Sequence, residues 1–100
     1  MPKGKLSAMV AHASVDAVLK SSKDKVQEWQ SQGMKKIILK VKDEKELLDF
    51  QKKAISAKLV TSLITDAGKT FFKEATRTCL AIGPDNEERI DKITGKLKMY

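Results

Sequence analysis

The chain has 100 residues, of which 41% are hydrophobic and 33% are charged. This length and composition predict one small folded domain over residues 1–100 and exclude a disordered chain. No apolar run approaches the ~20 residues of a membrane span, and the single cysteine, Cys79, excludes an internal disulfide and a cysteine-based zinc site.

The chain is strongly basic. Twenty Lys and Arg residues against 13 Asp and Glu give a net charge of +7, and 18 of the 20 basic residues are lysine. Such an excess attracts RNA, DNA or an anionic membrane face, although it also fits solubility or thermal adaptation. Lysine acts as a point charge, so a nucleic acid would be held by its backbone rather than read by its bases. The N-terminus lacks the apolar region of a signal peptide, so we expect a cytoplasmic protein.

The first expected element is a helix from Gly4 to about Lys20. Its apolar residues fall on nearly all sides, which is typical of a buried helix. One polar stripe carries Lys5, His12 and Asp16. A histidine on such a helix is more often a hydrogen-bonded core or hinge residue than a catalyst, so His12 is only a possible supporting residue.

The next elements alternate between helix and strand. A short helix is expected over residues 23–32, ending at Gly33, followed by a strand over 36–41. Asp43 and Glu46 form a capping box that opens a helix ending near Ala57, and a second strand covers 59–64. We expect these two strands to lie parallel in a right-handed βαβ unit.

Turns separate the expected elements in the last third of the chain. Asp66-Ala67-Gly68 ends the second strand, and the short connection after it predicts that the third strand, 76–82, runs antiparallel. A helix from about Asn86 to Lys92, capped by Asp85, completes an α/β chain.

Three positions could carry chemistry. Lys3-Gly4-Lys5 places two lysines at a helix N-terminus, where the helix macrodipole disfavours positive charge. This segment is therefore either a site for an anion or a developing oxyanion, or a basic end whose charges are solvated. Asp66 lies where the chain leaves the sheet, and it can orient water or simply form a turn. Thr78 could position water, although strand propensity alone explains it. Cys79 has no base near it in the sequence.

Five segments resemble motifs of the type-II (archaeal and eukaryotic) peptidyl-tRNA hydrolase family. Met1–Ala13 resembles M-G-K-G-K-x-A-A-Q-x-x-H-A, and Gln32–Lys36 with its strand resembles G-Q-x-K-[IV]-V-V-K. Ile64–Thr70 resembles I-x-D-A-G-x-T, and Thr76–Pro84 matches T-x-T-C-L-x-I-G-P. Ile90–Tyr100 resembles I-D-K-[IV]-T-G-x-L-K-L-[YL]. The motifs keep the family's order over almost the whole chain.

The resemblance implies a fold and an activity. It implies a three-layer α/β/α domain with a small mixed sheet, four-stranded in the family and expected here without the first strand, and a homodimer. It also implies cleavage of the ester that joins a peptide to tRNA, with no metal and no cofactor. The implied catalytic residues are Lys5, Asp66 and Thr78, and the weaker candidates for tRNA contact are Lys3, Lys35, Lys36 and Lys69.

The chain departs from the family pattern at two polar positions. Met9 replaces the glutamine of Q-x-x-H, and Phe71 replaces the glutamine after D-A-G-x-T. Together with the missing first strand, these changes favour an alternative, a non-catalytic RNA- or protein-binding relative of the family.

Overall fold

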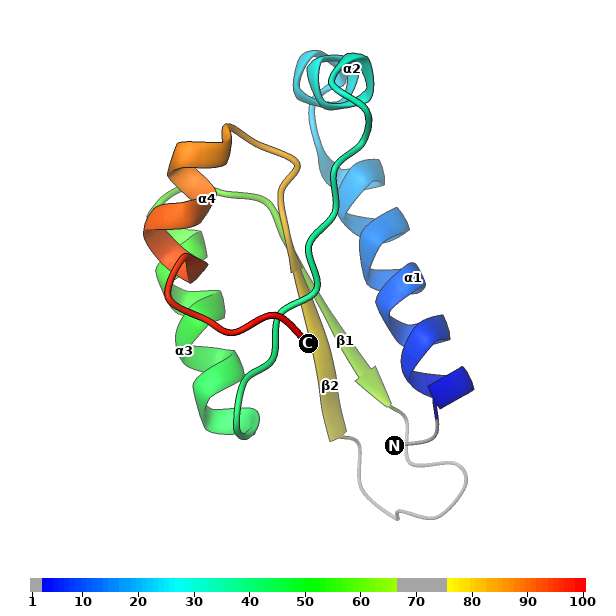
Figure 1. The fold of residues 1–100 in the computed structure, drawn as a ribbon, viewed down its shortest axis with the longest axis vertical. Helices are drawn as coiled ribbons and strands as arrows, with labels where there is room; N and C mark the ends of the chain where they lie inside the picture. Colours follow the sequence, from blue (N-terminus) through cyan, green and yellow to red (C-terminus); the bar gives the residue numbers. More distant parts are fainter. Residues whose placement is uncertain (1–2, 67–75) are drawn as a thin grey trace.

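The computed structural model describes residues 3–66 and 76–100, and for residues 66 and 76–78 it describes the backbone. Four helices and two strands follow one another along the chain (Figure 1). They are α1 (Lys3–Lys20), α2 (Lys23–Ser31), α3 (Glu44–Ser56), β1 (Thr61–Asp66), β2 (Thr76–Ile82) and α4 (Glu87–Thr94).

The elements form three layers. In Figure 1 the hairpin of β1 and β2 lies in the middle, with α1 on one side and α3 and α4 on the other. The two strands pair antiparallel, as expected for the third predicted strand. The α/β class and the α/β/α layering are therefore confirmed. The molecule measures 40 × 22 × 22 Å, and α2 lies at one end of the long axis.

Helix α1 is not buried all round, so that expectation is wrong. Ala13 and Ala17 are each 3% exposed because their small side chains let the helix pack closely on the hairpin. On the other face Val15 is 58% exposed and Leu19 is 78% exposed. Only one layer of the described chain covers the helix, so the second apolar side faces outward.

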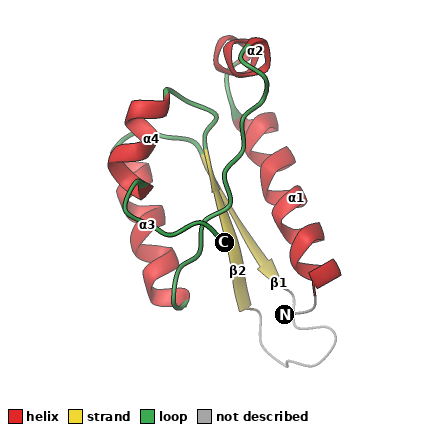
Figure 2. Cartoon of the chain, viewed as in Figure 1, coloured by secondary structure: helices red, strands yellow, loops and turns green. Residues whose placement is uncertain are grey.

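The strand expected over residues 36–41 is also wrong. Figure 2 draws this segment as a loop. Among the described residues it makes one isolated antiparallel bridge, between Leu39 and Met99. Its hydrogen bonds go to the end of the chain: the Lys40 N–H donates to the Lys98 carbonyl at 3.1 Å, and the Tyr100 N–H donates to the Ile38 carbonyl at 2.9 Å. The expected parallel βαβ pair is therefore absent from the described sheet, which contains β1 and β2 only.

Local chemistry fixes the helix ends. Asp43 Oδ1 accepts from the Glu46 N–H at 2.9 Å, while Glu46 Oε1 accepts from the Lys42 N–H at 3.2 Å, so the predicted capping box is confirmed. Gly33, with φ 98°, follows α2 in the left-handed region that glycine adopts without strain. Helix α4 is capped by Asn86 rather than by Asp85 as expected, because the Asn86 Oδ1 accepts from the Glu88 N–H.

Asp85 instead joins three parts of the fold. Its carboxylate, 5% exposed, accepts from Lys25 Nζ of α2 at 3.0 Å, from Arg89 Nη1 of α4 at 3.0 Å and from the Asn86 N–H at 2.6 Å. The Arg89 Nη2 donates to the Ala57 carbonyl just after α3. Burial by itself would raise the pKa of Asp85, but the hydrogen bonds from Asn86 and Lys25, with the charges of Lys25 and Arg89, hold it below its ordinary value.

Candidate active site

Strand β2 contains one residue more than β1 next to the predicted site. Ile64 pairs with Cys79 and Thr65 pairs with Arg77, so Thr78 is the extra residue of a β-bulge. A bulge twists the strand locally and turns its side chains away from the regular alternation, and bulges are common beside active sites. The irregularity falls on a residue that the sequence had singled out.

The first turn of α1 lies at the same end of the hairpin. The Cys79 thiol donates to the Met9 carbonyl at 3.3 Å, which fixes the second turn of α1 against β2 one residue from the bulge. Lys5 lies one helical turn before Met9, toward the N-terminus of α1. Figure 1 shows this N-terminus, the end of β1 and the start of β2 at the same end of the long axis. The fold therefore brings the backbones of Lys5, Asp66 and Thr78 to one region.

The entrance of α1 is electropositive. The first turn contains no acidic residue, and it carries Lys3, which is exposed, and Lys5, which is half-buried. The N–H groups of the first turn of a helix have no partner within the helix and carry partial positive charge. The lysine charges add to that potential, so the entrance favours an anion or an oxygen that gains negative charge.

His12 lies away from this entrance. It is exposed rather than in the core as expected, seven residues after Lys5, which is about 10 Å along the helix. One turn further, Asp16 accepts from the buried Ser62 hydroxyl at 2.6 Å and pairs with Lys20 at 2.9 Å, and these contacts lower the pKa of Asp16. This polar contact joins α1 to β1 and is structural.

Comparison with known proteins assigns the family. The family model described as peptidyl-tRNA hydrolase PTH2 matches residues 1–100. The chain belongs to this family. Three relatives, each named peptidyl-tRNA hydrolase, illustrate how closely it matches. The chain is 52% identical over 101 residues to the protein of Nanoarchaeum equitans, covering 98% of this chain and 88% of the relative. It is 49% identical to that of Sulfolobus acidocaldarius (99% and 89% covered) and 46% identical to that of Methanopyrus kandleri (99% and 87%).

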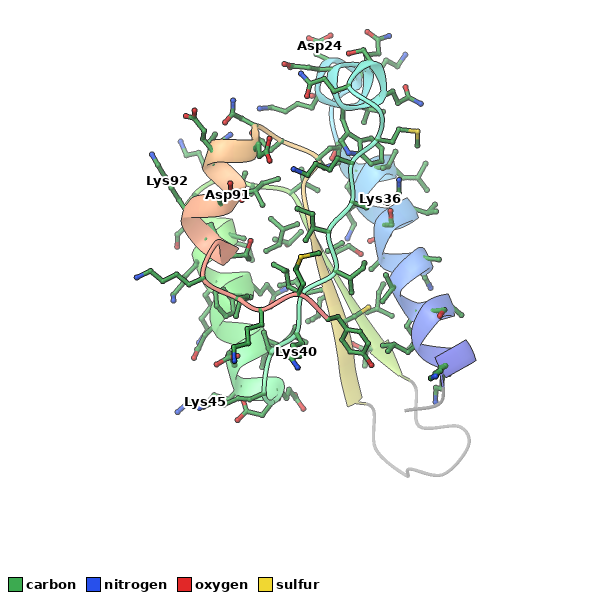
Figure 3. All side chains as sticks on the ribbon, in the orientation of Figure 1. Asp24, Lys36, Lys40, Lys45, Asp91 and Lys92 are labelled. Atoms are coloured by element: carbon green, nitrogen blue, oxygen red, sulfur yellow. The ribbon has the colours of Figure 1, made fainter. Side chains whose placement is uncertain are left out.

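The resemblance to the PTH2 family suggests four lysines for tRNA contact. The structure does not bring those that it describes together at one place. Lys35 Nζ pairs with Glu87 Oε1 at 2.7 Å, and this hydrogen bond raises the pKa of Lys35. Lys36 lies 5.0 Å above the Trp29 ring and donates to the Met34 carbonyl, in the half of the molecule opposite the α1 entrance (Figure 3). Lys3 lies at that entrance, and Lys69 lies outside the described residues.

Other chemistries find less support in this PTH2 chain. Burial raises the pKa of the Cys79 thiol, so the thiol stays protonated near neutral pH and is a poor nucleophile. Among the side chains that the structure describes, no three His, Cys, Asp or Glu residues are grouped so as to hold a metal ion. The helices of residues 3–66 and 76–100 are all too short or too polar to cross a membrane.

Proposed function

We propose that this chain hydrolyses the ester bond between a peptide and the ribose of tRNA, which releases the tRNA for reuse. One observation supports the proposal most directly. The basic N-terminus of α1, the end of β1 and the bulge of β2 lie at the same end of the molecule. A family match over the whole chain supports the reaction type. We also propose that the chain acts in the cytoplasm, where tRNA is used in translation.

The proposed mechanism needs two functions and uses the chain's own residues. Ester hydrolysis requires a group that orients and deprotonates water and a group that stabilises the oxyanion formed on the carbonyl. We assign the first role to Asp66 with Thr78, at the end of β1 and in the β2 bulge. We assign the second to Lys5 and the N–H groups of the α1 first turn. Neither role calls for a metal or an organic cofactor.

One observation favours a second candidate, a non-catalytic RNA- or protein-binding relative. Met9, half-buried in α1, stands where the family motif has a glutamine, and only its backbone carbonyl makes a polar contact with β2 among the described residues. Such a relative would bind tRNA without cleaving it.

The Lys5→Ala variant tests the oxyanion role. The wild-type chain is incubated with N-acetyl-aminoacyl-tRNA labelled in its acyl group, and release of the label is followed with time. We expect wild-type turnover and a decrease in kcat of about 10²–10³-fold in the variant, the cost of losing one oxyanion donor. The matched control is Lys23→Ala, an exposed lysine at the start of α2, which should keep the wild-type rate.

Two results would contradict this proposal. A Lys5→Ala variant as fast as the wild type removes Lys5 from the mechanism. A folded wild-type chain that binds tRNA but releases no label favours the non-catalytic relative.

We also propose that the chain forms a homodimer through an apolar groove. The groove, about 640 Å³, lies between α1 and the end of the chain. Its lining includes Val15 and Tyr100, which are 58% and 73% exposed, together with Leu6, Val10 and Ile38. Exposed apolar surface of this kind marks a protein–protein contact, and a second copy is the occupant that the family resemblance implies.

Light scattering tests the dimer. We expect a solution mass of twice 11.1 kDa for the wild type and a shift to the monomer mass for Val15→Asp, because a buried carboxylate opposes association. Ile55→Asp is the matched control, since Ile55 is 56% exposed on α3 and outside the groove. A wild type that stays at 11.1 kDa at high concentration would refute this arrangement.

A further inference from the structure

Two short lysine-rich segments lie side by side near the end of the chain. They are Lys40-Val41-Lys42 and Lys96-Leu97-Lys98, and both adjoin the antiparallel bridge between Leu39 and Met99. The Lys40 N–H donates to the Lys98 carbonyl at 3.1 Å, so Lys40 and Lys98 lie opposite each other. Lys42 and Lys96 lie next to this pair, at the bend before α3 and in the turn after α4.

These four residues line one hollow, which we call the four-lysine hollow. Its volume is about 290 Å³, and Val41 and Leu97 contribute apolar surface to it. All four lysines are exposed. Glu46 is the one acid of the lining, and its Oε1 is already hydrogen-bonded to the Lys42 N–H at the cap of α3. Within the described part of the chain, no ion pair joins any of the four lysines to a carboxylate.

This concentration of positive charge attracts an anion. Four ammonium groups around one hollow repel one another, and the lining contains no acid besides Glu46. The ammonium of lysine binds phosphate as a compact point charge with three donors. The hollow is therefore suited to bind a chain of phosphate groups.

The hollow is close enough to the candidate active site to serve it. Figure 3 shows Lys40 in the half of the long axis that contains the N-terminus of α1. Across this axis the molecule is only 22 Å wide. One RNA molecule can therefore contact the hollow and the entrance of α1 together.

We propose that the four-lysine hollow binds the phosphate backbone of the tRNA part of the substrate. The inference rests on the proposed function, because it assigns the surface that holds the RNA while the ester lies at the α1 entrance. Contacts of this kind hold and orient RNA without reading its sequence.

The Lys40→Gln/Lys98→Gln double variant tests this surface. We measure tRNA affinity at several salt concentrations and the kinetics of N-acetyl-aminoacyl-tRNA hydrolysis. We expect about tenfold weaker binding, a slope of log K against log salt that is lower by about 1.5–2, and a raised KM with unchanged kcat, because two phosphate contacts are lost. The melting temperature should not fall, since the variant removes a repelling pair.

The matched control is Lys23→Gln/Lys92→Gln, which removes the same charge from exposed positions on α2 and α4. Lys92 lies in the opposite half of the molecule in Figure 3. If this control weakens tRNA binding as much as the hollow variant does, the effect is one of net charge and the inference fails.

The two proposals fail separately. Wild-type hydrolysis with unchanged KM and salt slope in the hollow variant overturns the hollow and leaves the activity. A wild type that cleaves no ester, but whose tRNA binding still depends on Lys40 and Lys98, overturns the activity and supports the hollow.

Discussion

Asp66→Asn is expected to lower kcat for peptidyl-tRNA hydrolysis by about 10²–10⁴-fold, the usual contribution of one general acid or base. The amide keeps the size of the carboxylate but cannot accept a proton from water. KM should change little, because the RNA is held elsewhere. The measurement is the rate of acyl release from N-acetyl-aminoacyl-tRNA at saturating substrate.

Variants of neighbouring and distant residues sharpen this test. Thr78→Ser keeps a hydroxyl in the β2 bulge and should retain much of the rate, whereas Thr78→Val should lose most of it. Asp49→Asn, an exposed acid on α3, serves as the control and should behave as the wild type. An Asp66→Asn enzyme with wild-type kcat would exclude Asp66 as the residue that activates water.

Asp85→Ala is expected to reduce the free energy of unfolding by about 2–3 kcal/mol. The change removes the acceptor shared by Lys25 and Arg89 and leaves the Asn86 N–H without its partner. Because the two cations are about 40% exposed, water partly replaces the lost contacts, and the cost stays below that of a fully buried pair. Urea titration of the two proteins measures the difference, with Asp49→Ala as a control expected within about 0.5 kcal/mol of the wild type.

The Asp85 effect should depend on pH in a defined direction. The pKa of Asp85 is lower in the folded chain than its ordinary value of 3.8, so the unfolded chain binds more protons in this range. The stabilisation is therefore complete above about pH 5 and is lost as the pH falls through the folded pKa. The difference between wild type and Asp85→Ala should shrink on acidification, and a difference that grows instead would contradict this role.

Helix ends could be predicted from the sequence because their causes are local. Asp43 and Glu46 are three residues apart, and their hydrogen bonds need nothing from the rest of the fold. The same holds for Gly33 after α2. The exception is instructive: Asp85 looks like a cap in the sequence, but Lys25 and Arg89 bind its carboxylate and Asn86 becomes the cap.

The features that were predicted wrongly depend on contacts between residues far apart in the sequence. The apolar run over residues 36–41 has the composition of a strand, but a strand needs a partner, and the described chain offers it only one bridge, between Leu39 and Met99. In the same way, the apolar pattern of α1 did not reveal that one layer covers only one of its faces.

For the site, sequence motifs identified residues but not their arrangement. Lys5, Asp66 and Thr78 come from separate motifs, and that Thr78 is the bulge residue depends on the register between β1 and β2. The lysines at 40, 42, 96 and 98 were missed because each pair looks like an ordinary solvated segment until the chain brings them together. The repeated Lys-x-Lys spacing was the available signal.

The contact between Leu39 and Met99 also sets an order of events during protein synthesis. A ribosome makes a chain from its N-terminal side onward, and domains commonly begin to fold as they emerge. Here the segment before α3 must wait for Met99 and Tyr100, which are made after α4, before its backbone forms these hydrogen bonds. A chain halted before Met99 would therefore lack the partner of this segment, and the four lysines would not line one hollow.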